Sequence, residues 1–190
     1  MDVRVAHTSE LTGGELREVR ALLDAAFDGD FADEDFEHAL GGMHTLVRDP
    51  AGGLVAHGSV VMRRVVHRGR ALRTGYVEAV AVRADARRRG LGGQVMARLE
   101  QVVAGAYVLG ALSASEDGAA LYLGRGWQVW GGRIGVLAPD GPVPLPEEEG
   151  STYVWARGGP AGAGSGPRGP AGRGGRGAAR GGARARPRPT

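Results

Sequence analysis

The residues best placed to do chemistry form the pattern Arg87-x-x-Gly90-x-Gly92, between a strand-like and a helix-like run. Glycines at the start of a helix, here Gly90, Gly92 and Gly93, let the backbone turn its amides toward an anion. The helix dipole favours negative charge at the same place. Three consecutive arginines, residues 87–89, add positive charge. The pattern therefore predicts a site for a diphosphate group.

Two runs of the segment VEAVAVRADARRRGLGGQVMARL, residues 77–99, must position this loop. The first alternates with period two and is rich in β-branched residues, which predicts a strand. The faces of that strand would carry Val77, Ala79 and Ala81 on one side, and Glu78, Val80 and Val82 on the other. The second run has apolar residues at helical spacing, which predicts an amphipathic helix. Its stripe consists of Val95, Met96, Leu99, Val102 and Val103.

Composition removes most diphosphate chemistries, because the chain contains neither cysteine nor lysine. Without lysine, a Walker-type loop and a pyridoxal Schiff base are excluded. Without cysteine, thiolate catalysis, disulfides and cysteine-ligated zinc are excluded. The Gly-x-Gly turn of a Rossmann loop is also absent before the pattern. Coenzyme A remains as the natural diphosphate ligand.

Strand, Arg-x-x-Gly-x-Gly turn and helix together resemble the acetyl-CoA signature of the GNAT acyltransferase superfamily. Four further segments resemble one branch of it, the aminoglycoside 2′-N-acetyltransferases. They are AFDGDFADEDFEHALGGMHTLV (residues 26–47), RGRALRTGYVEAVAVRAD (68–85), GAYVLGALSAS (105–115) and LYLGRGWQVW (121–130). The resemblance covers residues 3–155. It implies a mixed α/β GNAT fold whose sheet splays after Val82 to form a coenzyme cleft, and a homodimer.

The chain divides into a domain of residues 1–157 and a basic tail of residues 158–190. The tail is almost wholly Gly, Ala, Pro and Arg, cannot build a core, and is expected to be disordered. The domain carries 17 arginines and 21 acidic residues, a net charge of −4, whereas the tail carries 7 arginines and no acid. Neither a long apolar run nor a signal-peptide pattern is present, so we expect a cytoplasmic protein.

The pattern of apolar residues and turn signals predicts a mixed α/β sheet with hairpins and crossovers. Strands are expected at residues 3–6, 43–48, 54–67, 70–82, 107–113, near 132–137 and at 152–155. Helices are expected at residues 14–27, 33–40, after Gly92 and at 116–125. Gly41 and Gly42 are suited to a left-handed cap after the second helix.

The resemblance also implies how the cosubstrate, acetyl-CoA, is bound. Its pantetheine would pair with the backbone of the strand that precedes the loop, and the Val80 amide would support the carbonyl oxygen as negative charge develops. The implied coenzyme-binding residues are Val80, Ala81, Val82, Arg87, Arg88, Arg89, Gly90, Leu91 and Gly92. No metal is expected, because the five histidines show no close ligand spacing.

Glu78 and Tyr122 are the candidates for proton transfer in a direct attack of an amine on the thioester. Glu78 stands in an otherwise apolar strand and would act as the base; the resemblance implies that it takes the amine proton through ordered water. Its alternative role is an edge carboxylate that faces water or pairs with Arg73 of the same strand. Tyr122 would protonate the departing thiolate, because the resemblance implies a tyrosine hydroxyl near the coenzyme sulfur, and its alternative role is packing against Trp127.

Acidic residues suit a polycationic substrate, since carboxylates attract and orient ammonium groups. Acids crowd residues 28–37 and 147–149, although most members of such runs are simply solvated. The substrate-binding residues that the resemblance implies are Asp35, Glu78, Ala79, Ser113, Glu147 and Glu148. The expected substrate is an aminoglycoside or a similar polyamine.

The C-terminus departs from the family, whose members continue with an acidic segment ending near a tryptophan. Here the Gly/Arg/Pro tail replaces that segment, either as a lineage-specific extension or through a shifted reading frame.

Two other functions stay open. The tail segment GRGGRGAARGG resembles arginine-glycine tracts that bind RNA, which would be the only nucleic-acid contact expected. Alternatively, the acceptor is a small polyamine, a mycothiol-type metabolite or a protein amine.

Overall fold

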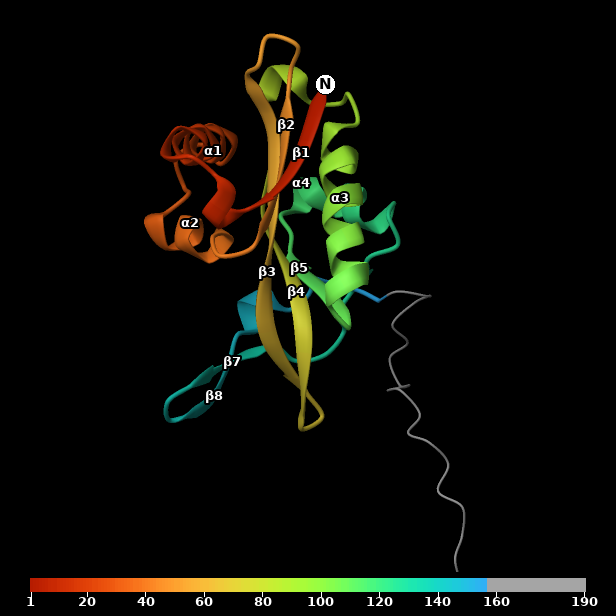
Figure 1. Cartoon of the computed structure of the whole chain (residues 1–190). Helices are drawn as coiled ribbons and strands as arrows, with labels where there is room; N and C mark the ends of the chain where they lie inside the picture. The colour runs from red at the N-terminus through yellow and green to blue at the C-terminus, as the bar shows by residue number, and fades with distance from the viewer. Residues whose placement is uncertain (157–190) are drawn as a thin grey trace, which may run out of the picture.

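A seven-stranded mixed sheet forms the centre of the computed structural model, which describes residues 1–156 (Figure 1). Its order is β1-β2-β3-β4-β5-β9-β6; β4 and β5 pair in parallel and the other neighbours pair antiparallel. The strands are β1 (Asp2–His7), β2 (Met43–Arg48), β3 (Leu54–His67), β4 (Arg70–Val82), β5 (Leu109–Ser113), β6 (Gln128–Val129) and β9 (Thr152–Trp155). A separate hairpin consists of β7 (Gly135–Ala138) and β8 (Gly141–Pro144).

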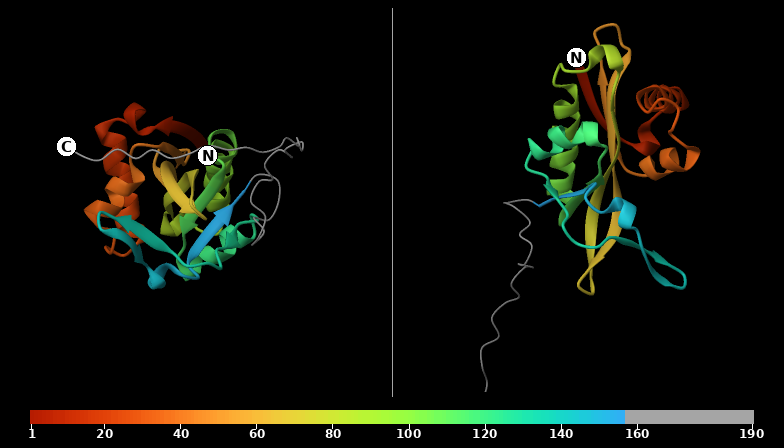
Figure 2. Two further views of the ribbon diagram at one scale, coloured as in Figure 1. Left: turned by 90° about the horizontal axis from the view of Figure 1, so that it is seen from below. Right: turned by 180° about the vertical axis from the view of Figure 1, so that it is seen from behind.

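Helices cover both faces of the sheet (Figure 2). The helices are α1 (Gly13–Ala26), α2 (Asp33–Ala39), α3 (Leu91–Ala106) and α4 (Glu116–Leu123), with short 3-10 turns at Thr8–Glu10, Ala84–Ala86 and Pro146–Glu148. α1 and α2 lie on one face, and α3 and α4 lie on the other. Leu23 and Leu46 belong to the buried cluster beneath α1, and Leu99 and Trp127 to the cluster beneath α3. The sheet is therefore buried on two sides, and its strands are correspondingly apolar.

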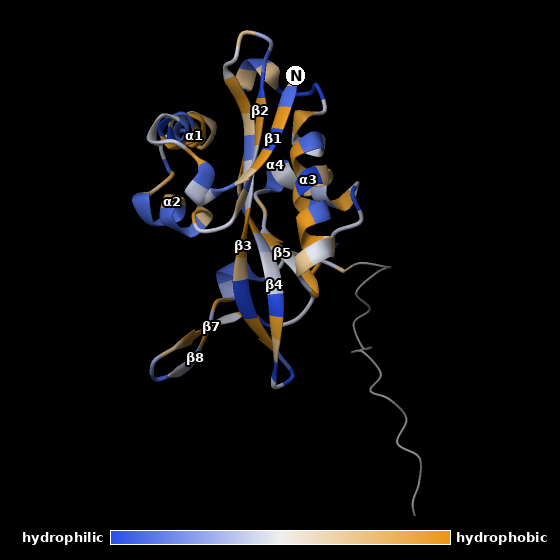
Figure 3. Ribbon diagram, in the orientation of Figure 1, coloured by the Kyte–Doolittle hydropathy of each residue, from blue (hydrophilic) through white to orange (hydrophobic). Residues whose placement is uncertain are grey.

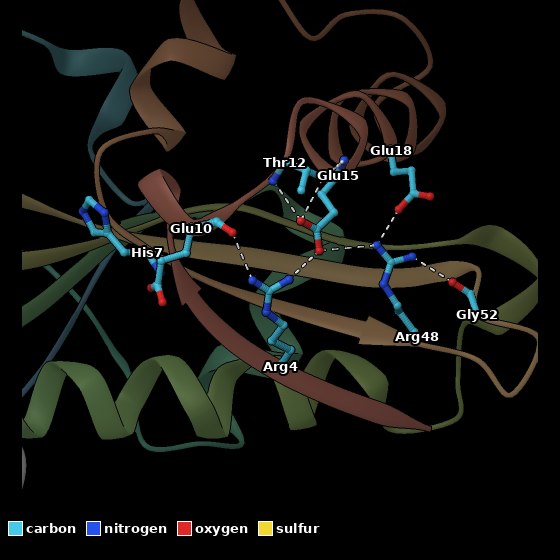
Figure 4. A network of polar contacts seen from close by, with 8 residues as sticks. All are labelled: Arg4, His7, Glu10, Thr12, Glu15, Glu18, Arg48 and Gly52. Atoms are coloured by element: carbon cyan, nitrogen blue, oxygen red, sulfur yellow. Dashed lines mark hydrogen bonds and ion pairs between the residues drawn. The ribbon is translucent and has the colours of Figure 1, made fainter.

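A network of polar contacts fixes α1 on the edge of the sheet (Figure 4). Thr12 caps the helix: its Oγ1 accepts from the Glu15 amide, and the Glu15 carboxylate accepts from the Thr12 amide. Glu15 also pairs with Arg4 of β1, and Glu18 pairs with Arg48 of β2. Two neighbouring strands thus bind the same face of α1.

One extra residue interrupts the pairing of β4 with β3. Ser59 lies opposite Glu78 and His57 lies opposite Ala81. Between these two pairs β4 has two residues, Ala79 and Val80, whereas β3 has only Gly58. Ala79, inside this stretch, has a φ of 52°, which L-residues other than Asn and Asp rarely adopt. β4 therefore contains a β-bulge immediately after Glu78.

The bulge corrects the expected assignment of side chains to the two faces of β4. Val77 packs with Val80 and Val82 in the cluster beneath α3, whereas Ala81 packs in the cluster beneath α1. Strict alternation places Val77 on the same face as Ala81, which is wrong, because the extra residue reverses the alternation. Glu78, the neighbour of Val77, consequently lies on the α1 and α2 face and does not share a face with Val80.

The two parallel strands β4 and β5 separate within the sheet. Their paired residues end at Tyr76 and Ala111, although β4 continues to Val82. The splay therefore begins at Val77, and the prediction that it begins after Val82 is wrong. Within residues 1–156, no strand pairs with the β5 side of Val77 to Val82, which leaves a peptide edge inside the sheet.

Most predicted elements are present, with differences at their ends. β5 begins at Leu109 because α3 continues to Ala106, and α4 ends at Leu123. The strand expected near residues 132–137 is β7, which pairs with the unpredicted β8 outside the main sheet. The predicted tail, and the RNA-binding hypothesis that depends on it, lie outside the described residues. Within residues 1–156, no helix combines the length and apolarity needed to span a membrane.

Two histidines are buried between the sheet and the helices α1 and α2. His44 of β2 and His57 of β3 are each 0% exposed, and their rings contact each other through a 2.9 Å hydrogen bond. Burial, and to a lesser degree the nearby His7, lower the pKa of His44 from 6.5 to about 4. Burial and the neighbouring His44 lower the pKa of His57 to about 3. Both rings are therefore neutral near pH 7.

Buried neutral histidines predict a loss of stability in mild acid. The unfolded chain binds protons below pH 6.5 at these rings whereas the native chain does not, so the free energy of unfolding is complete above that pH and falls below it. Urea unfolding at pH 7.5 and pH 5.0 should show a loss of about 4 kcal/mol from this pair. The double variant His44→Asn/His57→Asn should lose clearly less over the same interval; an equal loss would contradict the assignment.

Candidate active site

The predicted diphosphate loop precedes α3 as the sequence pattern suggests, but its glycines have different roles. Gly90 caps the helix with a φ of 75°, and Arg88 before it has a φ of 63°. The first amides of α3 have no partner within the helix, and no side chain caps them. Gly92 is an ordinary helical residue, and a Cβ there would lie 3.2 Å from the Leu121 side chain. Its hydrogen atom allows α4 to pack closely against α3.

Glu78, the candidate base, forms an ion pair with Arg63 of the neighbouring strand β3. Arg63 Nη2 donates to Glu78 Oε1 at 2.6 Å, so the alternative pairing with Arg73 is not the one observed. Burial raises the pKa of Glu78 above its ordinary value, Arg63 opposes that rise, and the carboxylates of Asp35 and Glu148 reinforce it. Glu78 thus sits where burial and like charges favour taking up a proton.

A second chain of contacts joins β4 and β5 to the 3-10 turn at Pro146–Glu148. The Tyr76 hydroxyl lies 3.0 Å from Ser113 Oγ, and Ser113 Oγ donates to Glu148 Oε2 at 2.8 Å. The Arg63 guanidinium lies over the Tyr76 ring, 4.7 Å from its centroid. The Glu78 pair and this chain therefore share one polar surface at the place where β4 and β5 separate.

The other predicted substrate residues differ in how closely they join this surface. Asp35 lies in the first turn of α2, where its Oδ2 accepts from the Ala32 amide at 3.0 Å, and its charge acts on Glu78. Figure 3 shows α2 as a largely hydrophilic ribbon. Glu147 is exposed, and within residues 1–156 it forms no hydrogen bond with Glu78 or Ser113. The structure thus groups Asp35, Glu78 and Ser113 with Glu148 and leaves Glu147 outside.

Tyr122, the candidate acid, lies on α4, across the sheet from Glu78. Its side chain is 7% exposed and contacts the rings of Trp127 and Tyr153. Burial raises its pKa to about 12, so the hydroxyl stays protonated at neutral pH. Among residues 1–156 this hydroxyl has no hydrogen-bond partner. Packing against Trp127 and a protonated hydroxyl available to a ligand are both compatible with this arrangement.

Comparison with known proteins gives the family. Residues 7–130 match the family model described as "Acetyltransferase (GNAT) domain". The chain belongs to the GNAT acetyltransferase family. A protein of Mycolicibacterium fortuitum named aminoglycoside 2′-N-acetyltransferase is 50% identical over 159 residues, which are 84% of this chain and 81% of that protein.

Solved structures agree with this GNAT fold. An acyl-CoA N-acyltransferase from Pseudomonas aeruginosa has a TM-score of 0.57 at 22% identity, over 82% of this chain and 99% of that one. Escherichia coli ElaA also has a TM-score of 0.57, at 18% identity over 80% of this chain and 97% of that one. At such identities the likeness concerns the fold alone.

The site of this GNAT acetyltransferase contains residues that the sequence pattern did not indicate. Arg63 and Tyr76 lie in strands that contain several other polar residues, so their type and position give no signal, and only the β3–β4 register brings them beside Glu78. Ser151 is a further one, since its Oγ donates to the backbone oxygen of Glu148 at 3.0 Å and orders that turn. Within the described part of the chain, no group of three or more His, Asp or Glu side chains is arranged to hold a metal.

The left-handed conformation of Gly90 gives a test of the diphosphate loop in this acetyltransferase. A valine at a φ of 75° is strained by about 1–2 kcal/mol, so Gly90→Val should raise the Kd for acetyl-CoA about tenfold. Isothermal titration calorimetry measures this change. The matched control is Gly52→Val, in the β2–β3 turn at a φ of 89°, which should cost similar stability and leave the Kd unchanged. Equal effects of both variants on Kd would reject the loop as the binding site.

The Arg63 pair predicts a shift in the pH dependence of catalysis. Arg63 lowers the pKa of Glu78, so its removal lets burial and the neighbouring carboxylates raise that pKa further. In Arg63→Gln, the acid limb of the kcat/KM profile should therefore move to higher pH, whereas Arg63→Lys should keep it near the wild-type position. An unmoved limb in Arg63→Gln would show that the observed ionisation is not that of Glu78.

Proposed function

We propose that this acetyltransferase transfers the acetyl group of acetyl-CoA to the 2′-amine of an aminoglycoside. The observation that carries the proposal is the meeting of Asp35, Glu78, Ser113 and Glu148 from four separate elements on one surface. Three carboxylates around one opening suit a substrate with several ammonium groups. The name and the 50% identity of the Mycolicibacterium relative support the same acceptor.

The coenzyme would occupy the opening between β4 and β5. The unpaired edge from Val80 to Val82 offers backbone groups to an extended pantetheine, in the manner of an added strand. The diphosphate would lie at the loop of residues 87–92, where the N-terminus of α3 follows three arginines. The coenzyme would then extend from the edge of β4 to the start of α3.

The chemistry would be a direct attack without a covalent acyl-enzyme. The amine nitrogen forms a bond to the thioester carbon while its proton passes to Glu78, through ordered water. The Val80 amide would donate to the carbonyl oxygen as it becomes negative. When the carbon–sulfur bond breaks, the sulfur takes the electron pair and Tyr122 supplies its proton. Glu78 and Tyr122 lie on opposite faces of the sheet, which suits an amine and a leaving thiolate on opposite sides of the carbonyl.

We also propose that the enzyme works in the cytoplasm as a homodimer, and that residues 1–157 form its catalytic domain. All site residues lie between Asp35 and Glu148, which supports a domain that needs no part of the tail for its chemistry. The homodimer is supported by the resemblance to the 2′-N-acetyltransferases.

Mass spectrometry of acetyl-CoA reactions tests the proposed acceptor and position. Tobramycin carries a 2′-amine whereas kanamycin A carries a hydroxyl there, so tobramycin alone should gain one acetyl group. Glu78→Gln should lower kcat about 10²- to 10⁴-fold, since a positioned base contributes that much, while acetyl-CoA binding stays intact. Acetylation of both antibiotics would reject the position, and acetylation of neither by a coenzyme-binding protein would reject the acceptor.

A further inference from the structure

The buried histidines join the bulge of β4 to the opposite edge of the sheet. Thr8 Oγ1 lies 2.7 Å from His44 Nε2, His44 Nδ1 lies 2.9 Å from His57 Nε2, and His57 Nδ1 lies 3.0 Å from the Ala79 carbonyl oxygen. This chain of contacts, which we name the histidine relay, runs from the end of β1 across β2 and β3 to β4. Neither ring has a part in the acetyl transfer described above.

The relay has a single direction of donation because its last acceptor is a carbonyl. The Ala79 oxygen can only accept, so His57 carries its proton on Nδ1 and its Nε2 accepts. His44 must then donate from Nδ1, and its Nε2 accepts from the Thr8 hydroxyl. Since both rings are neutral near pH 7, each has one proton and no other assignment satisfies all three contacts.

The first residue of the relay is itself fixed. Thr8 Oγ1 accepts from the Gly41 amide at 2.8 Å and the Gly42 amide at 3.2 Å. Gly42 lies against β3 so closely that a Cβ would be 2.0 Å from the Val60 carbonyl oxygen. The loop that follows α2 therefore fixes the Thr8 hydroxyl through two amide hydrogen bonds, and Thr8 in turn fixes the His44 ring through its contact with Nε2.

The last contact of the relay determines how one peptide group is oriented. The Ala79 carbonyl and the Val80 amide belong to the same planar peptide, and none of the described peptides is cis. In a trans peptide the C=O and the N–H point in opposite directions. A hydrogen bond that holds the carbonyl toward His57 therefore holds the Val80 N–H away from it. Ala79 needs such support, because its φ of 52° is unfavourable for alanine.

A proton wire is a different use of two linked histidines, and the contacts do not suit it. The partner of the Glu78 carboxylate is Arg63, and the structure gives no hydrogen bond between Glu78 and either ring. The relay ends on a backbone carbonyl, which does not take up a proton at neutral pH. Its geometry is that of a support.

We propose that His57, oriented by His44, is a positioning residue for acetyl transfer, which fixes the Ala79–Val80 peptide so that the Val80 amide faces the acetyl carbonyl oxygen. The inference rests on the proposed function, which assigns that amide to the oxyanion. It goes further by assigning the orientation of the amide to a side chain of the neighbouring strand β3.

Steady-state kinetics of two His57 variants test the proposal. His57→Leu removes the donor to Ala79 and should lower kcat with tobramycin about 10²-fold, as expected for a misplaced oxyanion donor, while the KM for acetyl-CoA changes less than about threefold. His57→Asn places an amide N–H near the position of Nδ1 and should recover at least about a tenth of the wild-type kcat. Equal kcat in His57→Leu and wild type would overturn the proposal, and so would the absence of recovery in His57→Asn.

A core variant separates positioning from general loss of stability. Leu23→Ala, in α1 on the same face, truncates a fully buried apolar side chain that forms no hydrogen bond with the relay. At a temperature where both variants are folded, Leu23→Ala should keep the wild-type kcat. A similar loss of kcat in both variants would overturn the positioning role.

Hydrogen exchange gives a reading that does not depend on the acceptor. Amides of residues 78–82 should exchange about tenfold faster in His57→Leu and near the wild-type rate in His57→Asn, because the bulge loses and regains its support. If the wild-type enzyme acetylates no aminoglycoside, the proposed function fails, and the exchange rates alone then test whether the relay fixes the Ala79–Val80 peptide. Unchanged exchange in His57→Leu would then show that the relay does not fix the peptide.

Discussion

One extra residue in β4 decides which face of the sheet each later side chain of that strand occupies. Val77 packs beneath α3 and Glu78 faces α1 and α2, and the bulge at Ala79 then places Val80 and Val82 beneath α3 and Ala81 beneath α1. Without the bulge, Val80 and Val82 would change faces and be lost from the core beneath α3. The bulge lies in the part of β4 that no longer pairs with β5. The packing of the core and the placement of Val80 relative to the candidate base thus depend on one local irregularity.

The electrostatics of the site follow from its placement at this opening. Charges of both signs act on Glu78: Asp35 and Glu148 raise its pKa, and Arg63, with which it forms an ion pair, lowers it. A cationic substrate would supply further positive charge to the same group. Because Arg63 also lies over the Tyr76 ring, its position is fixed from two sides. Arg63 therefore offsets part of the negative charge of these carboxylates.

The sequence was sufficient to predict the longer helices and strands and the loop before α3, because strong periodicity and glycine spacing are local signals. It could not indicate the bulge: alternating alanine and valine are apolar on both faces, so an added residue leaves no trace in the pattern. Arg63 and Tyr76 meet Glu78 only through register, and His44 and His57 are thirteen positions apart in two different strands. A histidine in each of two largely apolar segments, HTLV and LVAHGSVV, is the signal that could have suggested a buried pair. The short strands β6 and β8 have too few residues for a recognisable period.

Where β4 and β5 separate, β4 has backbone N–H and C=O groups that would form hydrogen bonds with a neighbouring strand in a continuous sheet. If acetyl-CoA pairs with these groups, the cosubstrate completes the hydrogen bonding of the native state, and its binding adds to the free energy of unfolding in proportion to the logarithm of its concentration. When coenzyme is scarce, the strands β5, β6 and β9 are joined to the rest of the sheet only by the short pairing of β5 with β4. The lifetime of the folded enzyme would in this way follow the metabolic state of the cell, through mass action alone.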